Sequence, residues 1–437
     1  MKRVCVVGAG LAGCEASWQL AQRGVRVELF EMKPLHYSPA HHSPGFAELV
    51  CSNSLKAEHL NNASGLLKAE MEKLDSLILR CGREARVPAG GALAVDREVF
   101  SALVTRAMED HPLITIRRER VTKIPAAPAI IATGPLTDEG LCRAIEEIPG
   151  MSRLHFFDAA APIVLKDSLD MNKVFAASRY GKGDGNDYLN CPMDEDEYNA
   201  FYDALVEAET SDPHGFEKKL VFDGCLAVEI LASRGRKTLC FGPLKPVGLV
   251  DPRTGKRPYA VVQLRQENLE GTLYNMVGFQ TRLKWGEQKR VFSMIPGLNH
   301  AEFVRYGVMH RNTYLNSPDV LTKNYALASD PSIRFAGQIT GVEGYMESAC
   351  SGLIAGLSLA CRLKGREEPS LGKETVIGAL EAHVRTRSLD FQPMNANFGI
   401  LTPLQERIRN KKERYLRLAQ RSLTLMDEYN KQLEESE

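Results

Sequence analysis

The first 31 residues contain the feature that most constrains the fold, a turn with GxGxxG spacing at Gly8, Gly10 and Gly13. An apolar run at 3–7 (RVCVV) precedes the turn, and the helix-compatible segment CEASWQLAQRG follows it. The next run, VRVELFE, is a second candidate strand that ends at Glu31. This order of strand, glycine turn, helix, strand and acid predicts a Rossmann-like nucleotide-binding unit of an α/β protein.

Each position of this unit has an expected role. The first glycine permits a tight turn, the second lets the backbone approach a pyrophosphate, and the third allows the helix to pack closely on the strand. The phosphates are expected at the helix N-terminus, and the acid is placed to accept hydrogen bonds from a ribose. The nucleotide could be NAD, FAD or S-adenosylmethionine. The predicted cofactor-binding residues of the unit are Gly8, Ala9, Gly10, Leu11, Ala12, Gly13 and Glu31.

Two later segments favour FAD. PAIIATGPLT is a buried candidate strand that leads into Thr133 and Gly134. IRFAGQITGVEGYMESACSGLIAGL combines a strand that runs into Gly337 with a helix whose N-terminus lies near Gly344. Backbone N–H groups there can bind a second anionic or carbonyl part of a cofactor, and the arrangement resembles FAD sites of two-dinucleotide flavoproteins. A second strand-GxGxxG-helix unit does not occur, so a separate NAD(P)H domain is not expected.

The length of the chain predicts more than one domain. A chain of 437 residues is too long for one compact core. The middle of the chain has turn-rich stretches such as GKGDGND, alternating strands such as YAVVQLRQE, and the helical run DEDEYNAFYDALVEAE. We therefore expect an FAD-binding domain in two parts, 1–165 and 301–437, with a mixed α+β insertion on the substrate side at 166–300.

The charge distribution limits how the chain could bind a nucleic acid. Lys+Arg and Asp+Glu both number 55, so the net charge is zero and nucleic acid would have to be held by local patches. RIRNKKERYLRLAQR at 407–421 has seven basic residues and one acid. This helix is either a solvated face or a stripe that contacts phosphates. The candidate RNA-binding residues are Arg409, Lys411, Lys412 and Arg414.

The ten cysteines indicate reduced thiols in the cytoplasm. The closest two, Cys5 and Cys14, lack CxxC spacing, so we expect neither a redox dithiol nor a metal site. The start MKRVCVVGAGLAGC imitates an export signal, but its apolar run is interrupted by glycines. No run approaches the roughly 18 apolar residues of a membrane span.

Two cysteines have local sequences that suit a catalytic thiolate, which needs a helix N-terminus, a cation or another polar setting. Cys51 precedes Ser52-Asn53-Ser54, which we expect to cap a helix that begins near Leu55. Cys225 follows Gly224 just before a helical run with basic residues further along. Three others are expected in packing, and a fourth is interpreted as a turn cysteine: Cys5, Cys14, Cys361 and Cys191.

The chain resembles one family over nearly its whole length, the bacterial folate- and FAD-dependent tRNA uridine C5-methyltransferases (TrmFO family). The resemblance implies a GidA-related flavin domain and FAD as cofactor. It further implies 5,10-methylenetetrahydrofolate as co-substrate, NAD(P)H as external reductant, and 5-methyluridine at position 54 in the T-loop of tRNA as product. The motifs that carry it are, in order, GAGLAGCEA, AELVCSNSL, ARVPAGGALAVDR, ATGPLT, DAAAPIV, YLNCPM, FGPLKPVGLVDPRTGKRPYAVVQLRQE, GFQTRLKWGEQKR, RYGVMHRNTYLNSP, AGQITGVEGYMESACSGL and FQPMNANFG.

The reaction of that family requires two catalytic groups from the protein. A thiolate that adds to C6 of uracil makes C5 nucleophilic, a base then removes the C5 proton, and reduced flavin reduces the methylene group. The resemblance implies that Cys225 is the nucleophile and Cys51 the base on the flavin side. It also implies folate or substrate contacts for His310, Arg311 and Trp285, although a lone histidine such as His310 is often a satisfied core residue.

Three other functions are also compatible with the sequence. Relatives of the family methylate ribosomal RNA, so the target could be a ribosomal uridine. A flavin oxidoreductase that acts on a small molecule, or a flavin-stabilised RNA-binding protein without catalysis, would carry the same nucleotide motif. The sequence leaves the oligomeric state undetermined.

Overall fold

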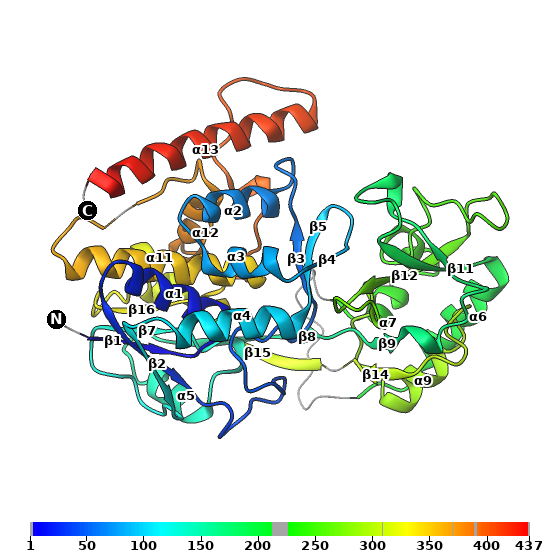
Figure 1. The fold of residues 1–437 in the computed structure, drawn as a ribbon, viewed down its shortest axis with the longest axis horizontal. Coiled ribbons are helices and arrows are strands. Elements are labelled where there is room, and N and C mark those ends of the chain that lie inside the picture. The colour runs from blue at the N-terminus through cyan, green and yellow to red at the C-terminus, as the bar shows by residue number, and fades with distance from the viewer. Residues whose placement is uncertain (1–2, 212–225, 308, 369, 389–390, 436–437) are drawn as a thin grey trace.

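The computed structural model describes residues 3–211, 226–307, 309–368, 370–388 and 391–435. These residues form two lobes, of which the larger contains both ends of the described chain (Figure 1).

A five-stranded parallel sheet lies in the larger lobe. The first strand lies at its centre, and its three valines, Val4, Val6 and Val7, are all buried. The strands predicted at 3–7 and up to Glu31 are present. In spatial order the strands are β16 (Ile333–Phe335), β7 (Ala129–Ile131), β1 (Arg3–Val7), β2 (Arg26–Glu31) and β6 (Ile114–Arg118).

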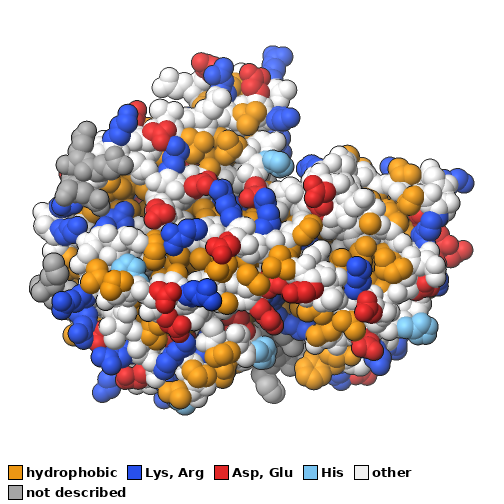
Figure 2. Space-filling view, in the orientation of Figure 1, with side chains coloured by type: hydrophobic (Ala, Val, Ile, Leu, Met, Phe, Trp, Pro, Cys, Tyr) orange, Lys and Arg blue, Asp and Glu red, His pale blue; other side chains and the backbone are white. Residues whose placement is uncertain are grey.

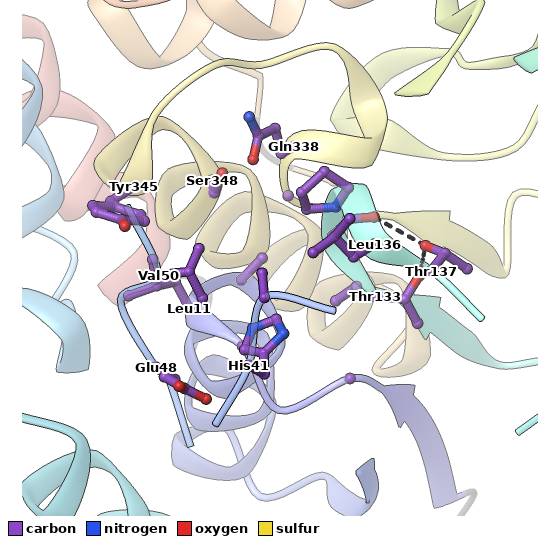
Figure 3. Close-up of a pocket in the computed structure, with 18 of the residues that line it drawn as sticks. Leu11, His41, Glu48, Val50, Thr133, Leu136, Thr137, Gln338, Tyr345 and Ser348 are labelled. Atoms are coloured by element: carbon purple, nitrogen blue, oxygen red, sulfur yellow. Dashed lines mark hydrogen bonds between the residues drawn. The ribbon is translucent and has the colours of Figure 1, made fainter. Parts of the chain in front are cut away.

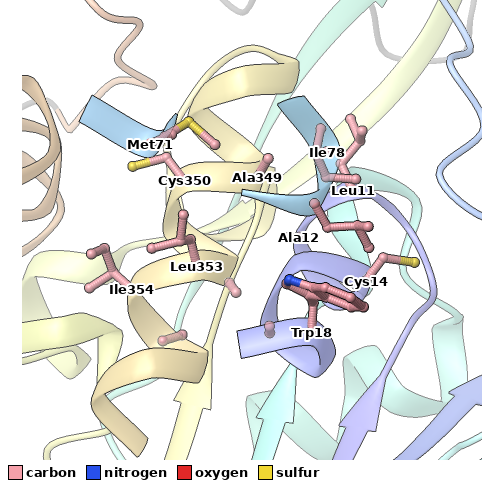
Figure 4. Packing of buried hydrophobic residues seen from close by; sticks show 14 of the residues in the cluster. Leu11, Ala12, Cys14, Trp18, Met71, Ile78, Ala349, Cys350, Leu353 and Ile354 are labelled. Atoms are coloured by element: carbon pink, nitrogen blue, oxygen red, sulfur yellow. The ribbon is translucent and has the colours of Figure 1, made fainter. Parts of the chain in front are cut away.

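Two helices, α1 (Leu11–Gln22) and α11 (Tyr345–Leu363), cross over the sheet at very short separation. A Cβ atom at Gly352 would overlap the Ala12 carbonyl, so glycine is required there for the close approach. Figure 4 shows the apolar side chains that both helices contribute to one core. Gly352 lies against Ala12 and Gly356 against Ala16, so the two helices run in the same direction and the start of α11 lies about two turns beyond the start of α1.

Further helices and a small antiparallel sheet complete the larger lobe. The helices are α2 (Ala63–Glu72), α3 (Leu77–Glu84), α4 (Arg97–Glu109), α5 (Glu139–Glu146), α10 (Ser317–Val320), α12 (Val376–Arg385) and α13 (Lys411–Glu435). The small sheet has the order β3 (Ser54–Ala57), β5 (Ala92–Val95), β4 (Arg86–Val87).

One buried carboxylate joins three of these helices. Glu70 of α2 accepts the backbone N–H groups of Val376 and Ile377 at the start of α12, both at 2.8 Å. Its Oε1 also accepts the hydroxyl of Ser422 in α13 at 2.5 Å. Because the N–H groups of a first helical turn lack partners within the helix, Glu70 fixes where α12 begins and where α13 docks.

The smaller lobe contains a six-stranded antiparallel sheet, which agrees with the mixed α+β character expected of the middle segment. Cys191 lies buried in its second strand, so the interpretation of a turn cysteine was wrong. The domain limits at 165 and 300 stay a prediction. In spatial order the strands are β10 (Phe175–Ala176), β11 (Tyr188–Met193), β12 (Ala260–Gln266), β13 (Leu273–Met276), β9 (Ile163–Leu165) and β14 (Phe303–Arg305). The helices are α6 (Glu195–Glu207), α7 (Val228–Ser233), α8 (Thr238–Phe241) and α9 (Trp285–Phe292).

An antiparallel ribbon of β8 (Arg153–Ala159) and β15 (Met309–Leu315) lies between the two sheets (Figure 1). The chain passes from the larger lobe into the smaller one and back along these two strands. In the part of the chain that the structure describes, no helix combines the length and apolarity needed to cross a bilayer.

Candidate functional site

A cavity of about 370 Å³ opens at the carboxyl ends of the parallel strands. Its walls include the residues that follow β1, β2, β7 and β16, and Ala160, Gln280 and Asn312 add the side that faces the ribbon and the smaller lobe. Figure 3 shows side chains from these separate segments turned toward one space. In open parallel sheets this edge is where ligands bind.

Ten of the eleven residues predicted to bind the cofactor line this cavity. Gly13 is the exception, because it lies behind the turn and a Cβ atom there would overlap the Gly8 carbonyl. Its role is therefore helix packing, as expected for the third glycine of the motif. The ten are Gly8, Ala9, Gly10, Leu11, Ala12, Glu31, Thr133, Gly134, Gly337 and Gly344.

The glycine turn has the shape of a cradle for a ligand. Gly8 has φ +98°, and a Cβ atom there would lie 2.6 Å from the Ala132 carbonyl oxygen. Gly10 has an ordinary extended backbone (φ −76°, ψ −170°), and a Cβ atom there would meet no described protein atom within 4 Å. Gly10 caps α1 and lines the cavity, so its missing side chain leaves space for a ligand at the helix N-terminus.

Glu31 is held rigidly at the end of β2. Its two carboxylate oxygens accept the backbone N–H groups of Ala9 and Lys33, both at 2.9 Å, and only 7% of the residue is exposed. Each carboxylate oxygen can accept further hydrogen bonds. Glu31 thus links the glycine turn to the second strand and presents its remaining lone pairs to the cavity, as a ribose hydroxyl requires.

A second helix N-terminus faces the same space. Gly344, with φ +115°, caps the 19-residue helix α11, and Tyr345, Met346 and Ser348 of its first turn line the cavity. Unpaired N–H groups of a helix start carry partial positive charge. The starts of α1 and α11 therefore give the cavity two positive ends, which suits a ligand with two separated electron-rich groups.

Polar residues of the loop after β2 form a wall that the sequence reasoning missed. His41 lines the cavity and shares a hydrogen bond of 2.6 Å with the Ser38 hydroxyl, and burial lowers the pKa of His41. For Glu48, burial acts to raise the pKa, but the His42 N–H and the Lys33 ammonium outweigh it and hold that pKa below its usual value. A loop without a regular pattern offers no sequence signal for such contacts.

Cys51 lies in the cavity wall, but its local structure differs from the prediction. The helix expected near Leu55 is wrong, because Ser54–Ala57 forms strand β3. The Asn53 side chain donates to the carbonyls of Val95 and Gln266, both at 3.0 Å, and so fastens this segment to neighbouring strands. Cys51 instead lies beside the start of α11, where its sulfur is 3.0 Å from the Tyr345 hydroxyl.

The other residues predicted for catalysis or for substrate contact do not share one location. Cys225 lies outside the described residues. His310 and Arg311 pair with Asp158 and Phe157 in the ribbon register. Trp285 opens α9 with 62% of its surface exposed, stacks on Tyr306 with ring centroids 5.8 Å apart, and does not line the cavity.

The predicted RNA-binding residues lie away from the cavity. Lys411, Lys412 and Arg414 are exposed on the first turn of α13, and Arg409 is exposed just before it. The same turn contains Tyr415, which stacks on a neighbouring phenylalanine with centroids 4.1 Å apart. Figure 2 shows basic side chains at the upper edge of the larger lobe, where α13 begins.

Comparisons with known proteins agree with this architecture. A family model described as glucose inhibited division protein A matches residues 3–367. A protein of Desulforamulus reducens named methylenetetrahydrofolate--tRNA-(uracil-5-)-methyltransferase TrmFO is 60% identical over 429 residues, which are 98% of this chain and 97% of that protein. A protein of the same name from Desulfitobacterium hafniense is 58% identical and covers 98% of both chains.

A solved structure confirms the fold. GidA of Aquifex aeolicus, in its form II crystal, aligns with a TM-score of 0.72 at 16% identity, over 98% of this chain and 73% of that one. The Rossmann-like fold predicted from the glycine turn and the GidA-related fold implied by the family resemblance are therefore both correct. With identities near 60% over almost the full length of curated relatives, this chain belongs to the TrmFO family of the glucose inhibited division protein A group.

Proposed function

We propose that this chain uses 5,10-methylenetetrahydrofolate and FAD to methylate C5 of a uridine in tRNA, forming 5-methyluridine at position 54 of the T-loop. The names of the relatives support the reaction class. The observation that carries the proposal is that the dinucleotide cradle and the Cys51 thiol line one cavity. A thiol beside a flavin cradle suits a reaction that needs both a proton acceptor and a reductant.

The cavity fits FAD on structural grounds. Open space at Gly10, the oriented carboxylate of Glu31 and the two helix starts match a pyrophosphate, a ribose and a distant second anchor. We propose that the glycine turn binds the pyrophosphate and that Gly337 and Gly344 border the far end of the cofactor. Reduced FAD would supply the electrons that turn the transferred one-carbon unit into a methyl group, with NAD(P)H as the external reductant.

We assign the two cysteines different roles. Cys225 is proposed as the nucleophile that adds to C6, and Cys51 as the base that removes the C5 proton. Val228, shortly after Cys225 in sequence, donates its backbone N–H to the carbonyl of Gln280 at 2.7 Å, and Gln280 lines the cavity. The described chain that follows Cys225 is thus joined to a residue of the cavity wall.

Folate and RNA contacts are proposed from the residues around the site. His310 and Arg311 belong to the strand that also contributes Asn312 to the cavity wall, which supports a folate contact there. Trp285 is proposed as a substrate contact outside the cavity. Arg409, Lys411, Lys412 and Arg414 are proposed to contact tRNA phosphates, in the cytoplasm where the thiols stay reduced.

Trapping with 5-fluorouridine separates the roles of the two cysteines. A 5-fluorouridine substrate has no C5 proton to lose, so a covalent adduct accumulates wherever the nucleophile is intact. We expect Cys51→Ala to trap fluorinated tRNA while methylating no normal tRNA, and Cys225→Ala to do neither. An adduct with Cys225→Ala but none with Cys51→Ala would reverse the assignment.

Nucleoside analysis tests the target. Unmodified tRNA, incubated with the enzyme, reduced FAD and methylenetetrahydrofolate, should gain 5-methyluridine at position 54. Matched incubations with tRNA that carries cytidine at position 54, and with ribosomal RNA, serve as controls. Methylation of ribosomal RNA alone would contradict the tRNA assignment, and flavin turnover without RNA methylation would favour a small-molecule oxidoreductase.

A further inference from the structure

One phenol is hydrogen-bonded to both the backbone and the thiol of Cys51. The backbone N–H of Cys51 donates to the Tyr345 hydroxyl oxygen at 2.9 Å, and the N–H of Ser52 donates to the same oxygen at 3.3 Å. The Cys51 sulfur lies 3.0 Å from that oxygen. A phenolic hydroxyl has one proton to donate and can accept hydrogen bonds on its oxygen. With two N–H donors on the oxygen, the phenol proton is directed to the sulfur.

A sulfur that accepts a hydrogen bond from the phenol binds it most strongly when the sulfur is ionised, that is, as a thiolate. Hydrogen bonds to an ionised acceptor are stronger than those between neutral groups. The phenol itself stays protonated, because burial raises the pKa of Tyr345 well above its ordinary value. The pair therefore consists of a neutral donor and a sulfur in the accepting role.

Three arginines, which we call the arginine clamp, hold the segment on both sides of Cys51. Each comes from a different element: α4, β12 and β14. Their hydrogen bonds are those of Arg97 to the Leu49 carbonyl (2.6 Å), Arg305 to the Val50 carbonyl, and Arg265 to the Ser52 hydroxyl (2.8 Å) and the Asn53 side-chain carbonyl (2.9 Å). The clamp fixes the backbone on both sides of Cys51, and two of its members, Arg265 and Arg305, also interact electrostatically with the thiol.

One carboxylate opposes the clamp. Glu267, which is buried after β12, pairs with Arg97 and interacts with the other two arginines. Arg265, Arg305 and Tyr345 interact electrostatically with Cys51. The clamp arginines outnumber the one carboxylate that pairs with them, and the start of α11 adds partial positive charge. Such surroundings favour a thiolate.

We propose that Tyr345 is a positioning residue that, together with the arginine clamp, holds Cys51 as a thiolate in the cavity wall. The use of this thiolate rests on the proposed function, in which Cys51 is the base. There the S–H bond forms as the C5–H bond breaks, and the electron pair of that bond stays on the uracil. A thiol already carries its proton and cannot accept another in this way, so the thiolate is needed before each turnover.

The test measures the ionisation of Cys51 without RNA or folate. The flavin-loaded protein is alkylated with iodoacetamide over about pH 6 to 9.5, and the modified peptides are quantified by mass spectrometry. We expect the Cys51 midpoint in the wild type to lie below the ordinary thiol value of about 8.5. Tyr345→Phe should raise this midpoint by about one unit, so that alkylation at neutral pH slows about tenfold. The half-buried Cys240 is the internal reference, and its profile should stay unchanged.

A matched pair of variants at Arg305 separates charge from shape. Arg305→Gln should raise the Cys51 midpoint and Arg305→Lys should restore most of the wild-type value, whereas a purely structural role would disturb both alike. If Tyr345→Phe fails to fold, the two Arg305 variants test the thiolate proposal in its place. An ordinary thiol midpoint in the wild type, or a midpoint that neither Tyr345→Phe nor Arg305→Gln moves, would overturn the proposal. If Cys51→Ala still methylates tRNA while the wild-type midpoint is low, the base assignment fails and the thiolate assignment stands.

Discussion

At the scale of single residues, each of the three glycines in the first turn has a different structural reason. Gly8 avoids a clash with the Ala132 carbonyl, and Gly13 avoids one with Gly8 itself. Gly10 avoids no protein atom, and its backbone angles suit any residue. Only the space reserved for a ligand explains a glycine there, which makes Gly10 the position where binding can be disturbed without disturbing the fold.

We therefore expect Gly10→Val to fold normally and to lose bound flavin. The valine side chain would occupy the space in front of the α1 N-terminus, where the pyrophosphate has to approach. Flavin absorbance per protein, measured after purification, should fall by at least about tenfold. Gly286→Val is the matched control, because Gly286 is also open and lies on α9 outside the cavity. Full flavin occupancy in Gly10→Val would contradict the FAD assignment.

Residue patterns predicted the cofactor cradle better than the setting of the thiol. A GxGxxG turn is local, so spacing and the two later glycine segments were enough to predict ten positions in the cavity wall. The polar residues after Cys51 are equally compatible with a helix cap. Tertiary contacts, such as the hydrogen bond from Asn53 to the Val95 carbonyl, stabilise strand β3 there instead. The arginine clamp and Tyr345 come from residues far apart in sequence, and no periodicity brings such groups together.

At the scale of elements, α13 is fastened to the larger lobe through Glu70. Burial raises the pKa of Glu70 to about 7, although the Ser422 hydroxyl and the N–H groups of Val376 and Ile377 act to lower it. In the unfolded chain a glutamate has a pKa of about 4.3. Between these values the folded protein binds a proton that the unfolded chain does not, so the free energy of unfolding falls as pH rises through this window.

The pH dependence gives a test of this junction. Chemical denaturation from about pH 5 to about pH 7.5 should show a decline in the free energy of unfolding for the wild type and a flatter profile for Glu70→Gln. Glu70→Gln is also expected to be less stable throughout, because its amide group faces backbone donors. Ser422→Ala, which removes one hydrogen bond and keeps the carboxyl group, should cost about 1 kcal/mol and retain the slope. An unchanged slope in Glu70→Gln would exclude Glu70 as its source.

At the scale of the whole molecule, the balanced charge makes any RNA interface local. One concentration of positive charge is the start of α13, and a second is the exposed segment of the smaller lobe that contains Lys237, Lys245, Lys256 and Arg257. The cavity opens between the parallel sheet and the ribbon that joins the lobes. The balanced charge of the whole chain favours neither segment, so the two basic segments are competing candidates for contact with tRNA.

Neutralising each segment in turn distinguishes them. We expect replacement of Arg409, Lys411, Lys412 and Arg414 by glutamine to weaken tRNA binding and to flatten its salt dependence, because each phosphate that the protein no longer neutralises reduces the slope of log K against log salt by about 0.9 or less. The matched control replaces Lys237, Lys245, Lys256 and Arg257 by glutamine, and circular dichroism is used to check that both variants fold. Affinities measured at several salt concentrations should change mainly in the α13 variant. If the smaller-lobe variant alone loses affinity and slope, the α13 stripe is a solvated face and tRNA approaches the cavity across the smaller lobe.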